Sequence, residues 1–271
     1  MLIDCGECAQ LSIRRNRLKF SRISHIFISH LHGDHLLGLP GLLSTLAMHE
    51  TGGTVHVHIF EEGARLMQSV LGTVCNSDNM NVVFDIMSPQ GGLVYEDKML
   101  TVTAFPLYHR VPCVGFRFQE KPKLRHLRGD MVRFFNIPVS RLADIKGGAD
   151  YVTPSGEVIA NERLTTAASP SVSYAYCSDT MFNPAVAEAV KGVDVLYHEA
   201  TYGNDSALYA KMYGHSTAAQ AAEIARKAGV KSLLIGHFSK RYDDVSVLEK
   251  EAREIFPNTK AVNEGDIIDI K

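Results

Sequence analysis

The stretch Ile28-Ser29-His30-Leu31-His32-Gly33-Asp34-His35 places four good metal ligands within six residues. The apolar run Ile26-Phe27-Ile28 leads into it and is typical of a buried strand. Imidazole and carboxylate groups suit zinc and similar transition metals. His30 and His32 are two residues apart, so at a strand end they point to the same side. Gly33 can take the backbone of a tight turn, which lets Asp34 and His35 face a second metal. The density of ligands argues against a merely polar turn and predicts a two-metal site.

The composition is typical of a soluble enzyme. At 271 residues with 45% hydrophobic content, the chain suffices for one sizeable domain, residues 1–271. No apolar run of roughly 18 residues predicts a transmembrane helix, and no signal segment opens the chain, which favours the cytoplasm. The five cysteines are not spaced like those of a disulfide framework, which is consistent with reduced thiols. Cys5-x-x-Cys8 is interpreted as packing at a strand end rather than a zinc knuckle or redox pair.

Apolar strand candidates alternate with helical periodicity, the pattern of a layered α/β fold. The strand candidates are residues 26–29, 54–59, 82–85, 100–104, 113–118, 172–177, 193–198, 231–236 and 267–270. Helices are expected over 61–71, 183–190, 217–228 and 245–255. For the third helix, Ser216 or Thr217 is the candidate N-cap and Gly229 follows its C-terminal end. The candidate ligands fall at strand ends and in the loops that follow, where such a scaffold usually presents a site.

Further candidate ligands follow apolar strands later in the chain. His109 comes after residues 100–104, Asp179 after 172–177 and His237 after 231–236. Taken alone, a histidine in such a place is more often a hydrogen-bonded structural residue, so the residues by themselves leave these assignments open. The remaining histidines lack ligand partners in the sequence and are interpreted as structural: His25, His49, His126 and the pair His56-x-His58.

Several motifs resemble tRNase Z, a family of the metallo-β-lactamase superfamily, whose signature is His-x-His-x-Asp-His. The narrower resemblance is carried by Leu2-Ile3-Asp4-Cys5-Gly6-Glu7, Gly38-Leu39-Pro40-Gly41-Leu42-Leu43, His109-Arg110-Val111-Pro112, Ser178-Asp179-Thr180, His198-Glu199-Ala200-Thr201, Gly214-His215-Ser216-Thr217 and His237-Phe238-Ser239-Lys240-Arg241-Tyr242. It runs from residue 2 to about residue 270, with the middle weakly matched. The presence of His-Glu-Ala-Thr and His-Ser-Thr on one chain is its most specific part.

The resemblance implies an α/β fold, the αββα sandwich of the superfamily, with two zinc ions. The implied ligands are His30, His32 and His109 at the first zinc, Asp34, His35 and His237 at the second, and Asp179 bridging both. Two zinc ions about 3.5 to 4 Å apart would activate a water and neutralise charge on the attacking and leaving oxygens. The same ligands also accept manganese or iron.

Catalytic roles are expected for three residues near these ligands. Asp34 is the implied proton acceptor, which helps to deprotonate or orient the attacking water. His215 is the candidate donor of a proton to the leaving 3′-oxygen, because a histidine titrates near working pH. Glu199 would orient His215 and favour its charged form. His198 is expected to support the ligands without touching a metal.

The implied activity is a zinc-dependent endoribonuclease that removes the 3′ trailer from tRNA precursors. It would leave a 3′-hydroxyl on the tRNA and a 5′-phosphate on the trailer. Members of the family usually form homodimers, so a homodimer is expected here. The expected nucleic-acid partner is RNA rather than DNA, and no membrane partner is expected.

Residues 118–165 correspond to the arm with which the family grips tRNA. Net charge is −2, so the whole chain is no general polyanion binder, yet eight Lys or Arg residues lie between Arg117 and Lys146. A second basic run covers residues 14–19. One such run is usually a solvated face, but two beside a phosphodiester site favour RNA contact, with Lys121, Lys123, Arg125 and Arg128 as the candidates. In place of the family's Gly-Pro-rich tip stands Asn136-Ile137-Pro138-Val139-Ser140-Arg141-Leu142.

The front of the chain also departs from the family, whose members usually have a few tens of residues before the Leu2–Glu7 match. Those residues form opening strands, whereas this chain begins at Met1 of the match. Either the start is misassigned, or the chain is shortened, or the protein lacks these N-terminal strands. In the last two cases a bare sheet edge is expected.

Two other functions stay open on the sequence. One keeps the fold and metals but acts on a cyclic nucleotide, another small phosphodiester or an ester, which would leave the basic arm without a purpose. The other is a non-catalytic RNA-binding member of the fold, which would leave the complete ligand set unexplained. Zinc content separates this last class from the enzymes.

Overall fold

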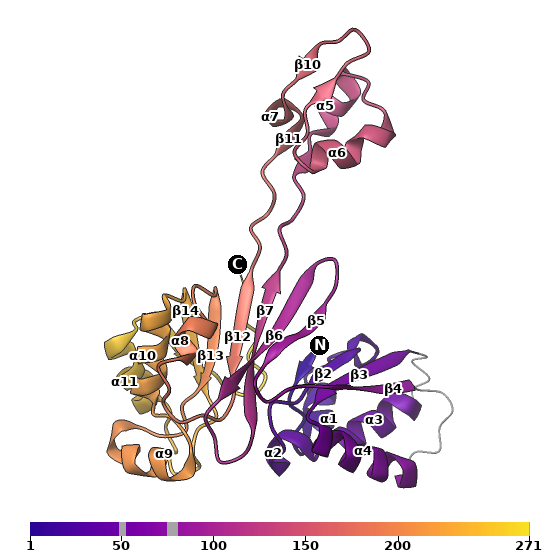
Figure 1. The fold of residues 1–271 in the computed structure, drawn as a ribbon. Helices are drawn as coiled ribbons and strands as arrows, with labels where there is room; N and C mark the ends of the chain where they lie inside the picture. Colours follow the sequence, from indigo (N-terminus) through magenta and orange to yellow (C-terminus); the bar gives the residue numbers. More distant parts are fainter. Residues whose placement is uncertain (49–52, 75–80, 271) are drawn as a thin grey trace.

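The computed structural model describes residues 1–48, 53–74 and 81–270. Within them the chain forms two β-sheets packed face to face with helices on both outer surfaces, as an αββα sandwich requires (Figure 1). The predicted fold class is therefore confirmed. His49 and Cys75, two of the residues interpreted above, lie outside the described residues.

The first sheet of the described residues has four parallel strands in the order β1-β2-β3-β4. They are β1 (Leu2–Ile3), β2 (His25–Phe27), β3 (Thr54–Ile59) and β4 (Asn81–Ile86). Their outer face packs against α1 (Ala9–Arg15), α3 (Leu39–Met48) and α4 (Glu61–Val74). The short η1 (Phe20–Arg22) leads into β2, and α2 (Gly33–Leu36) follows it.

The second sheet has seven strands among the described residues, in the order β15-β14-β13-β12-β7-β6-β5. They are β5 (Gly92–Glu96), β6 (Leu100–Leu107), β7 (Cys113–Glu120), β12 (Ser173–Cys177), β13 (Val195–Glu199), β14 (Ser232–Gly236) and β15 (Thr259–Ala261). Strands β12 to β15 run parallel, and β5 to β7 are antiparallel neighbours. Because β12, β13 and β14 are parallel, the residues that follow them meet at one edge of the sheet.

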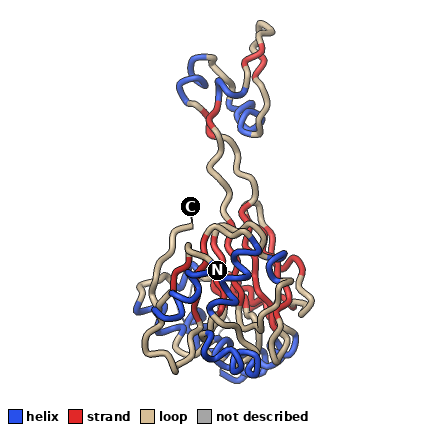
Figure 2. Tube along the Cα trace, turned by 90° about the vertical axis from the view of Figure 1, so that its left-hand side faces the viewer, coloured by secondary structure: helices blue, strands red, loops and turns tan. Residues whose placement is uncertain are grey.

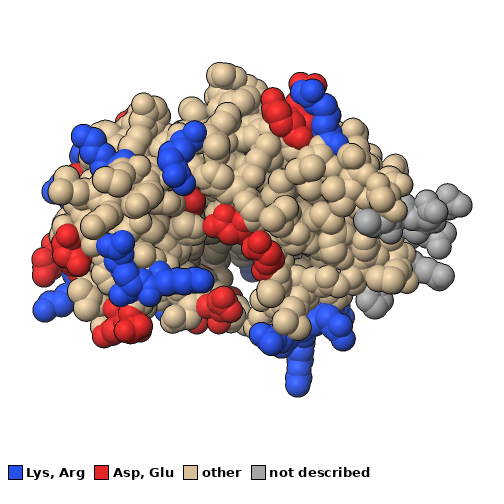
Figure 3. Space-filling view, turned by 90° about the horizontal axis from the view of Figure 1, so that it is seen from below, with Lys and Arg blue, Asp and Glu red and all other residues tan. Residues whose placement is uncertain are grey.

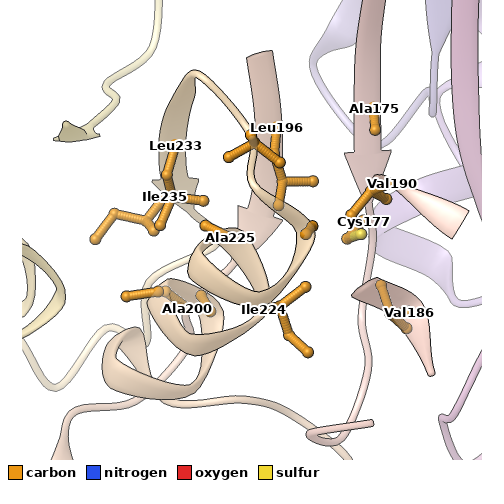
Figure 4. Packing of buried hydrophobic residues seen from close by; sticks show 14 of the residues in the cluster. Ala175, Cys177, Val186, Val190, Leu196, Ala200, Ile224, Ala225, Leu233 and Ile235 are labelled. Atoms are coloured by element: carbon orange, nitrogen blue, oxygen red, sulfur yellow. The ribbon is translucent and has the colours of Figure 1, made fainter. Parts of the chain in front are cut away.

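The helices α8 (Val186–Ala189), α10 (Ala218–Ala228) and α11 (Ser246–Ile255) cover this second sheet. Buried alanines such as Ala225 let α10 approach Leu233 and Ile235 of β14 (Figure 4). Thr217 caps α10 through a reciprocal pair of hydrogen bonds with Gln220, which stabilises the helix start. The predicted N-cap and the left-handed Gly229 are thus confirmed.

One predicted strand is wrong. Residues 267–270 form no strand in the described chain, and Ile267 is 89% exposed. The edge position beside β14 is taken instead by β15, whose short Thr-Lys-Ala sequence carries little apolar signal. An edge strand with one neighbour needs few apolar residues, so hydrophobic pattern alone selected the wrong segment.

The residues between β7 and β12 leave the sandwich as an arm (Figures 1 and 2). Two extended segments lead to a small folded tip with its own apolar cluster, which includes Ile145, Ile159 and Leu164. The tip contains β8 (His126–Leu127), α5 (Gly129–Phe134), η2 (Val139–Arg141), α6 (Leu142–Lys146), β9 (Tyr151–Val152), β10 (Val158–Ile159), α7 (Asn161–Leu164) and β11 (Thr165–Thr166). Buried Asn161 ties it together by donating to the carbonyls of Ile145 and Ala149, each at 2.7 Å. Residues 136–142, which stand in place of the family's Gly-Pro-rich tip, thus form η2 and the start of α6.

No helix in the described part of the chain is both long and apolar enough to cross a membrane.

His25, interpreted above as a structural residue, takes part in a histidine cluster apart from the candidate ligands. Pairing of β2 with β3 sets His25 beside His56, and His25 Nδ1 lies 3.1 Å from His58 Nε2. Asp85 of β4 completes the cluster, 2.9 Å from His56 Nδ1. These contacts join strands far apart in sequence, so the sequence could not reveal them.

We expect this cluster to make stability depend on pH between about 6.5 and 4. Burial, which outweighs the neighbouring Asp85 carboxylate, lowers the pKa of His58 to about 4. Below about pH 6.5 the unfolded chain binds a proton at His58, whereas the native chain binds it only near pH 4. The free energy of unfolding therefore decreases as the pH is lowered from about 6.5 to 4, by up to roughly 3 kcal/mol. Urea unfolding of chelator-treated protein from pH 7.5 to 4 measures the slope.

His58→Gln should flatten that slope, whereas His126→Gln, on the exposed arm, should keep it. A wild-type slope in His58→Gln would contradict the assignment.

Candidate metal centre

The candidate ligands come from both sheets and meet at the lower end of the molecule in Figure 1, near α2 and α9 (Ala207–Tyr213). They lie after β2, in α2, and after β6, β12 and β14, and His215 lies between α9 and α10. The seven implied metal ligands are all brought together: His30, His32, Asp34, His35, His109, Asp179 and His237. Viewed from this end, the surface has a hollow between the two halves, with acidic side chains at its rim and Lys and Arg side chains around it (Figure 3).

The first group is formed by His30, His32 and His109. His32 Nδ1 lies 3.1 Å from His30 Nε2 and 3.3 Å from His109 Nε2. Two nitrogens bound to one tetrahedral zinc at about 2.0 to 2.1 Å lie about 3.3 Å apart, so this spacing fits a metal. Burial lowers the pKa of His30 to about 2, which keeps its ring neutral, as a ligand must be.

The second group is formed by Asp34, His35 and His237. Asp34 Oδ2 lies 3.6 Å from His35 Nε2 and 3.9 Å from His237 Nε2. The Asp34 side chain is 63% exposed, so one edge of this group is open to solvent. The neighbouring His237 and His35 rings outweigh desolvation and hold the pKa of Asp34 well below its ordinary range, so the group carries a carboxylate at neutral pH.

Asp179 lies between the two groups. Its Oδ2 is 3.7 Å from His30 Nε2 and 3.9 Å from His109 Nε2, whereas its Oδ1 is 3.6 Å from His35 Nε2 and 3.3 Å from His237 Nε2. Oδ1 is buried and has no hydrogen-bond partner among the described residues. A buried carboxylate oxygen without a partner is costly, and a cation between the groups would satisfy it. The donor set therefore fits metal ions on both sides of Asp179.

The ring orientations of three ligands are fixed by hydrogen bonds at Nδ1. His109 Nδ1 donates to the Gly214 carbonyl at 2.7 Å, and His35 Nδ1 lies 2.7 Å from Asp4 Oδ2. Thr201 Oγ1, 2.9 Å from His237 Nδ1, donates its own proton to Glu199 and so accepts from the ring. In each case the contact at Nδ1 turns Nε2 towards the cluster, which is how outer partners commonly orient metal ligands.

Glu199 is buried and connects the loops around His215. Its Oε1 accepts the backbone N–H groups of Thr180 and Ser216 and lies 3.0 Å from His215 Nδ1. Its Oε2 accepts from Thr201. Burial alone would raise the pKa of Glu199, but the hydrogen bond and charge of His215 outweigh it and the pKa is lowered. Glu199 is thus a carboxylate that holds His215 by Nδ1 and leaves Nε2 for another contact.

Asp4 is a functional residue that the sequence analysis missed. Besides holding His35, it accepts hydrogen bonds from the Ser29 backbone and hydroxyl and from Tyr176. Gly6 explains how it reaches the site, because a Cβ there would lie 1.9 Å from the Asp34 carbonyl oxygen. The motif Leu-Ile-Asp-Cys-Gly was visible, and its position next to an apolar strand was the signal that could have been used.

Two of the five described non-glycine residues with left-handed φ lie at this centre. Asp4 and His237 both have left-handed backbone angles, with φ of 54° and 60°. Such conformations cost non-glycine residues about 1 to 3 kcal/mol and persist where surrounding contacts enforce them.

Replacing Asp4 by Asn should weaken metal binding about 10- to 100-fold. The amide would keep the shape of the side chain but remove the charge that orients His35 and favours its role as a donor to the metal. Competition between protein and a chromogenic chelator measures the affinity.

Asp85→Asn is the matched control, since Asp85 also contacts a histidine but lies outside the centre. Equal affinity of Asp4→Asn and wild type would contradict the role given to Asp4.

The other predicted site residues lie farther out. His198 is buried, and its Nδ1 contacts the Glu199 carbonyl at 2.7 Å, so its supporting role stays a prediction. The candidate RNA contacts already have partners in or near the arm: Lys121 with Glu96, Lys123 with Glu120, Arg125 with Thr165, and Arg128 with Asp130.

Comparisons with known proteins find relatives that match almost the whole chain. Ribonuclease Z of Bacteroides fragilis (strain YCH46) is 51% identical over 265 residues, which cover 97% of this chain and 87% of that protein. Ribonuclease Z of Parabacteroides distasonis (strain ATCC 8503) is also 51% identical over the same shares. The crystal structure of human tRNase Z, short form, has a TM-score of 0.70 at 22% identity and covers 99% of this chain and 87% of its own. The family model of the anti-Pycsar protein Apyc1 matches residues 1–126.

Proposed function

This chain belongs to the ribonuclease Z family, and from that membership we propose that it is a metal-dependent endoribonuclease that removes the 3′ trailer of tRNA precursors. The observation that carries this function is the Glu199–His215 pair, which stands beside a centre of seven metal-ligating residues. Many hydrolases have a metal centre. An imidazole held beside the centre can in addition donate a proton to an alkoxide, which is a poor leaving group without one.

We assign two zinc ions to the centre. His30, His32, His109 and Asp179 would hold one, and Asp34, His35, His237 and Asp179 the other. Bound there, the metals supply an activated water nucleophile and positive charge beside the scissile phosphate. His and carboxylate ligands suit zinc and also accept related metals.

Asp34 handles the attacking water. It is ionised, and its side chain is largely exposed beside His35 and His237. A carboxylate in this place accepts a hydrogen bond from the water, turns a lone pair of the water towards phosphorus, and takes up its proton.

His215 handles the leaving group. Glu199 occupies Nδ1, so the proton on Nε2 is available to the 3′-oxygen of the ribose as the phosphorus–oxygen bond breaks. The new bond joins the water oxygen to phosphorus. The products are a tRNA with a 3′-hydroxyl and a trailer with a 5′-phosphate.

The arm at residues 118–165 is the proposed tRNA grip, within a single domain of residues 1–271. Lys121, Lys123 and Arg125 stay candidate contacts along its entrance, and Arg128 stays one at the start of α5 in the tip. At the tip, the exposed Arg133 of α5 and Lys146 of α6 form no ion pair with any described residue. Cations that lack a carboxylate partner are the ones free to neutralise phosphate.

Charge reversal at the tip tests whether the substrate is tRNA or a small phosphodiester. Arg133→Glu with Lys146→Glu should raise KM for a tRNA precursor by about tenfold or more. The slope of log affinity against log salt should become shallower by about one for each phosphate that is no longer neutralised. Hydrolysis of bis(4-nitrophenyl) phosphate should not change, because a small substrate cannot reach the arm.

Arg226→Glu with Lys250→Glu, two exposed residues on α10 and α11 of the body, is the control. An unchanged KM for the precursor in the tip variant would contradict the grip and favour the small-substrate function.

We further propose a homodimer in the cytoplasm. The described surface of α9 exposes Leu208 and Met212 next to the centre, 82% and 66% exposed, and such side chains suit a protein interface. The described cysteines are all free, as a reducing compartment allows. Sedimentation at micromolar concentration tests the dimer.

A further inference from the structure

A cavity of about 340 Å³ opens beside His215. Its walls come from the loops after β6 and β12 and from α9 and α10. It is lined by Tyr108, Met181, Phe182, Lys211, His215 and Gln220. Apart from His215, none of these residues has a role in the function proposed above.

The cavity walls are held in place by the same contacts that hold the catalytic pair. Met181 N–H donates to the Tyr108 carbonyl at 2.7 Å, and Tyr108 N–H donates to Thr180 Oγ1 at 3.1 Å. Thr180 N–H in turn donates to Glu199. The opposite wall is anchored by α10, where the side-chain oxygen Oε1 of Gln220 accepts from the backbone N–H of Thr217. The cavity is therefore a built part of the site rather than a gap between mobile loops.

The lining has the chemistry of a site for an unpaired nucleobase. Tyr108 is 62% exposed, so its ring is open to contact by a ligand, and Met181 and Phe182 add apolar surface to the lining. Single-stranded RNA is bound by stacking of bases on such side chains together with cations that follow the backbone. Lys211 supplies a cation, since it is exposed and forms no ion pair with the described residues.

We propose that this cavity receives the base of the nucleotide that carries the leaving 3′-oxygen, which is the last nucleotide of the mature tRNA. This rests on the proposed function, in which His215 protonates that oxygen. Because His215 both faces the metal centre and lines the cavity, the nucleotide on the leaving side passes directly over it. Its base then stacks against Tyr108 and Met181, and Lys211 neutralises the phosphate on its 5′ side.

The test is a cycle of two enzymes and two substrates under single-turnover conditions. Wild type and Tyr108→Ala are compared on a precursor with a normal last tRNA nucleotide and on one with an abasic ribose there. A stacked base contributes about 1 to 3 kcal/mol, so either change alone should lower kcat/KM roughly 5- to 150-fold. Both changes together should cost no more than either one, because each removes the same stacking interaction.

Three further variants make the cycle decisive. Tyr108→Phe keeps the ring and should restore most of the rate. Leu93→Ala truncates a 60% exposed residue on β5, away from the cavity, and should change nothing. Because Tyr108 precedes the ligand His109, metal content is measured for each protein, and Met181→Ala repeats the cycle from the other wall if Tyr108→Ala loses metal.

Effects of Tyr108→Ala and the abasic ribose that multiply would overturn the proposal, as would an unchanged rate in Tyr108→Ala. Failure of wild type to cut the normal precursor at all would instead overturn the proposed function, so the two failures are distinguishable.

Discussion

Replacing His215 by Ala is expected to slow cleavage of a tRNA precursor by roughly 10²- to 10⁴-fold, the usual contribution of a positioned general acid. Metal content and precursor affinity should stay at the wild-type level. The reason is that His215 Nδ1 is bound by Glu199, 3.0 Å away, and each of the two ligand groups is complete without it. Single-turnover cleavage, metal analysis and filter binding on the same preparation measure all three quantities.

The variant Glu199→Gln distinguishes the role of Glu199, which holds the imidazole ring, from the role of His215, which donates the proton. The amide removes the negative charge beside His215 and keeps one oxygen, which can still accept from the Thr180 and Ser216 backbone and face His215, whereas the hydrogen bonds from Thr201 to the other oxygen are lost. We expect slower cleavage with full metal content, and a smaller loss than in His215→Ala. His215 also lies 4.0 Å from Asp179 Oδ2, so loss of metal from His215→Ala would show that it is a ligand and contradict its assignment as the acid.

Replacing Asp179 by Asn is expected to remove bound metal and to lower cleavage by on the order of 10³-fold or more. The two carboxylate oxygens face different ligand groups, and the buried Oδ1 has no other partner among the described residues. Asn offers one neutral oxygen and an amide nitrogen that cannot ligate, so at least one group loses its oxygen ligand from this position. Metal-ion catalysis supplies several kcal/mol, and each 1.36 kcal/mol is about tenfold in rate.

Asp85→Asn provides the matched control, because Asp85 likewise contacts histidines but lies in the cluster between β3 and β4. It should keep full metal content and activity. Two equivalents of metal in Asp179→Asn, with activity retained, would contradict a bridging role for Asp179.

The local part of the centre was readable from the sequence. His30 to His35 lie within one strand end and one turn, so their spacing alone predicts that they converge. Asp179 and His237 could be placed only by resemblance, because they meet the cluster through the parallel pairing of β12, β13 and β14. That pairing is a property of the whole sheet, and no short segment encodes it.

What the sequence left out consists of contacts between distant segments. Asp4 reaches His35 because two backbones approach closely at Gly6. His25 contacts His58 across the neighbouring strands β2 and β3. Apolar content favours residues 267–270 over β15 as a strand, but the place beside β14 at the sheet edge depends on contacts between distant segments.

The most direct test is cleavage of a tRNA precursor with a 3′ trailer, with and without chelator, followed by mapping of both product ends. We expect a single cut directly after the last tRNA nucleotide, a 3′-hydroxyl on the tRNA and a 5′-phosphate on the trailer. Cleavage should stop with the chelator and return with zinc. Cleavage that persists without metal, or product ends with a 3′-phosphate, would contradict it.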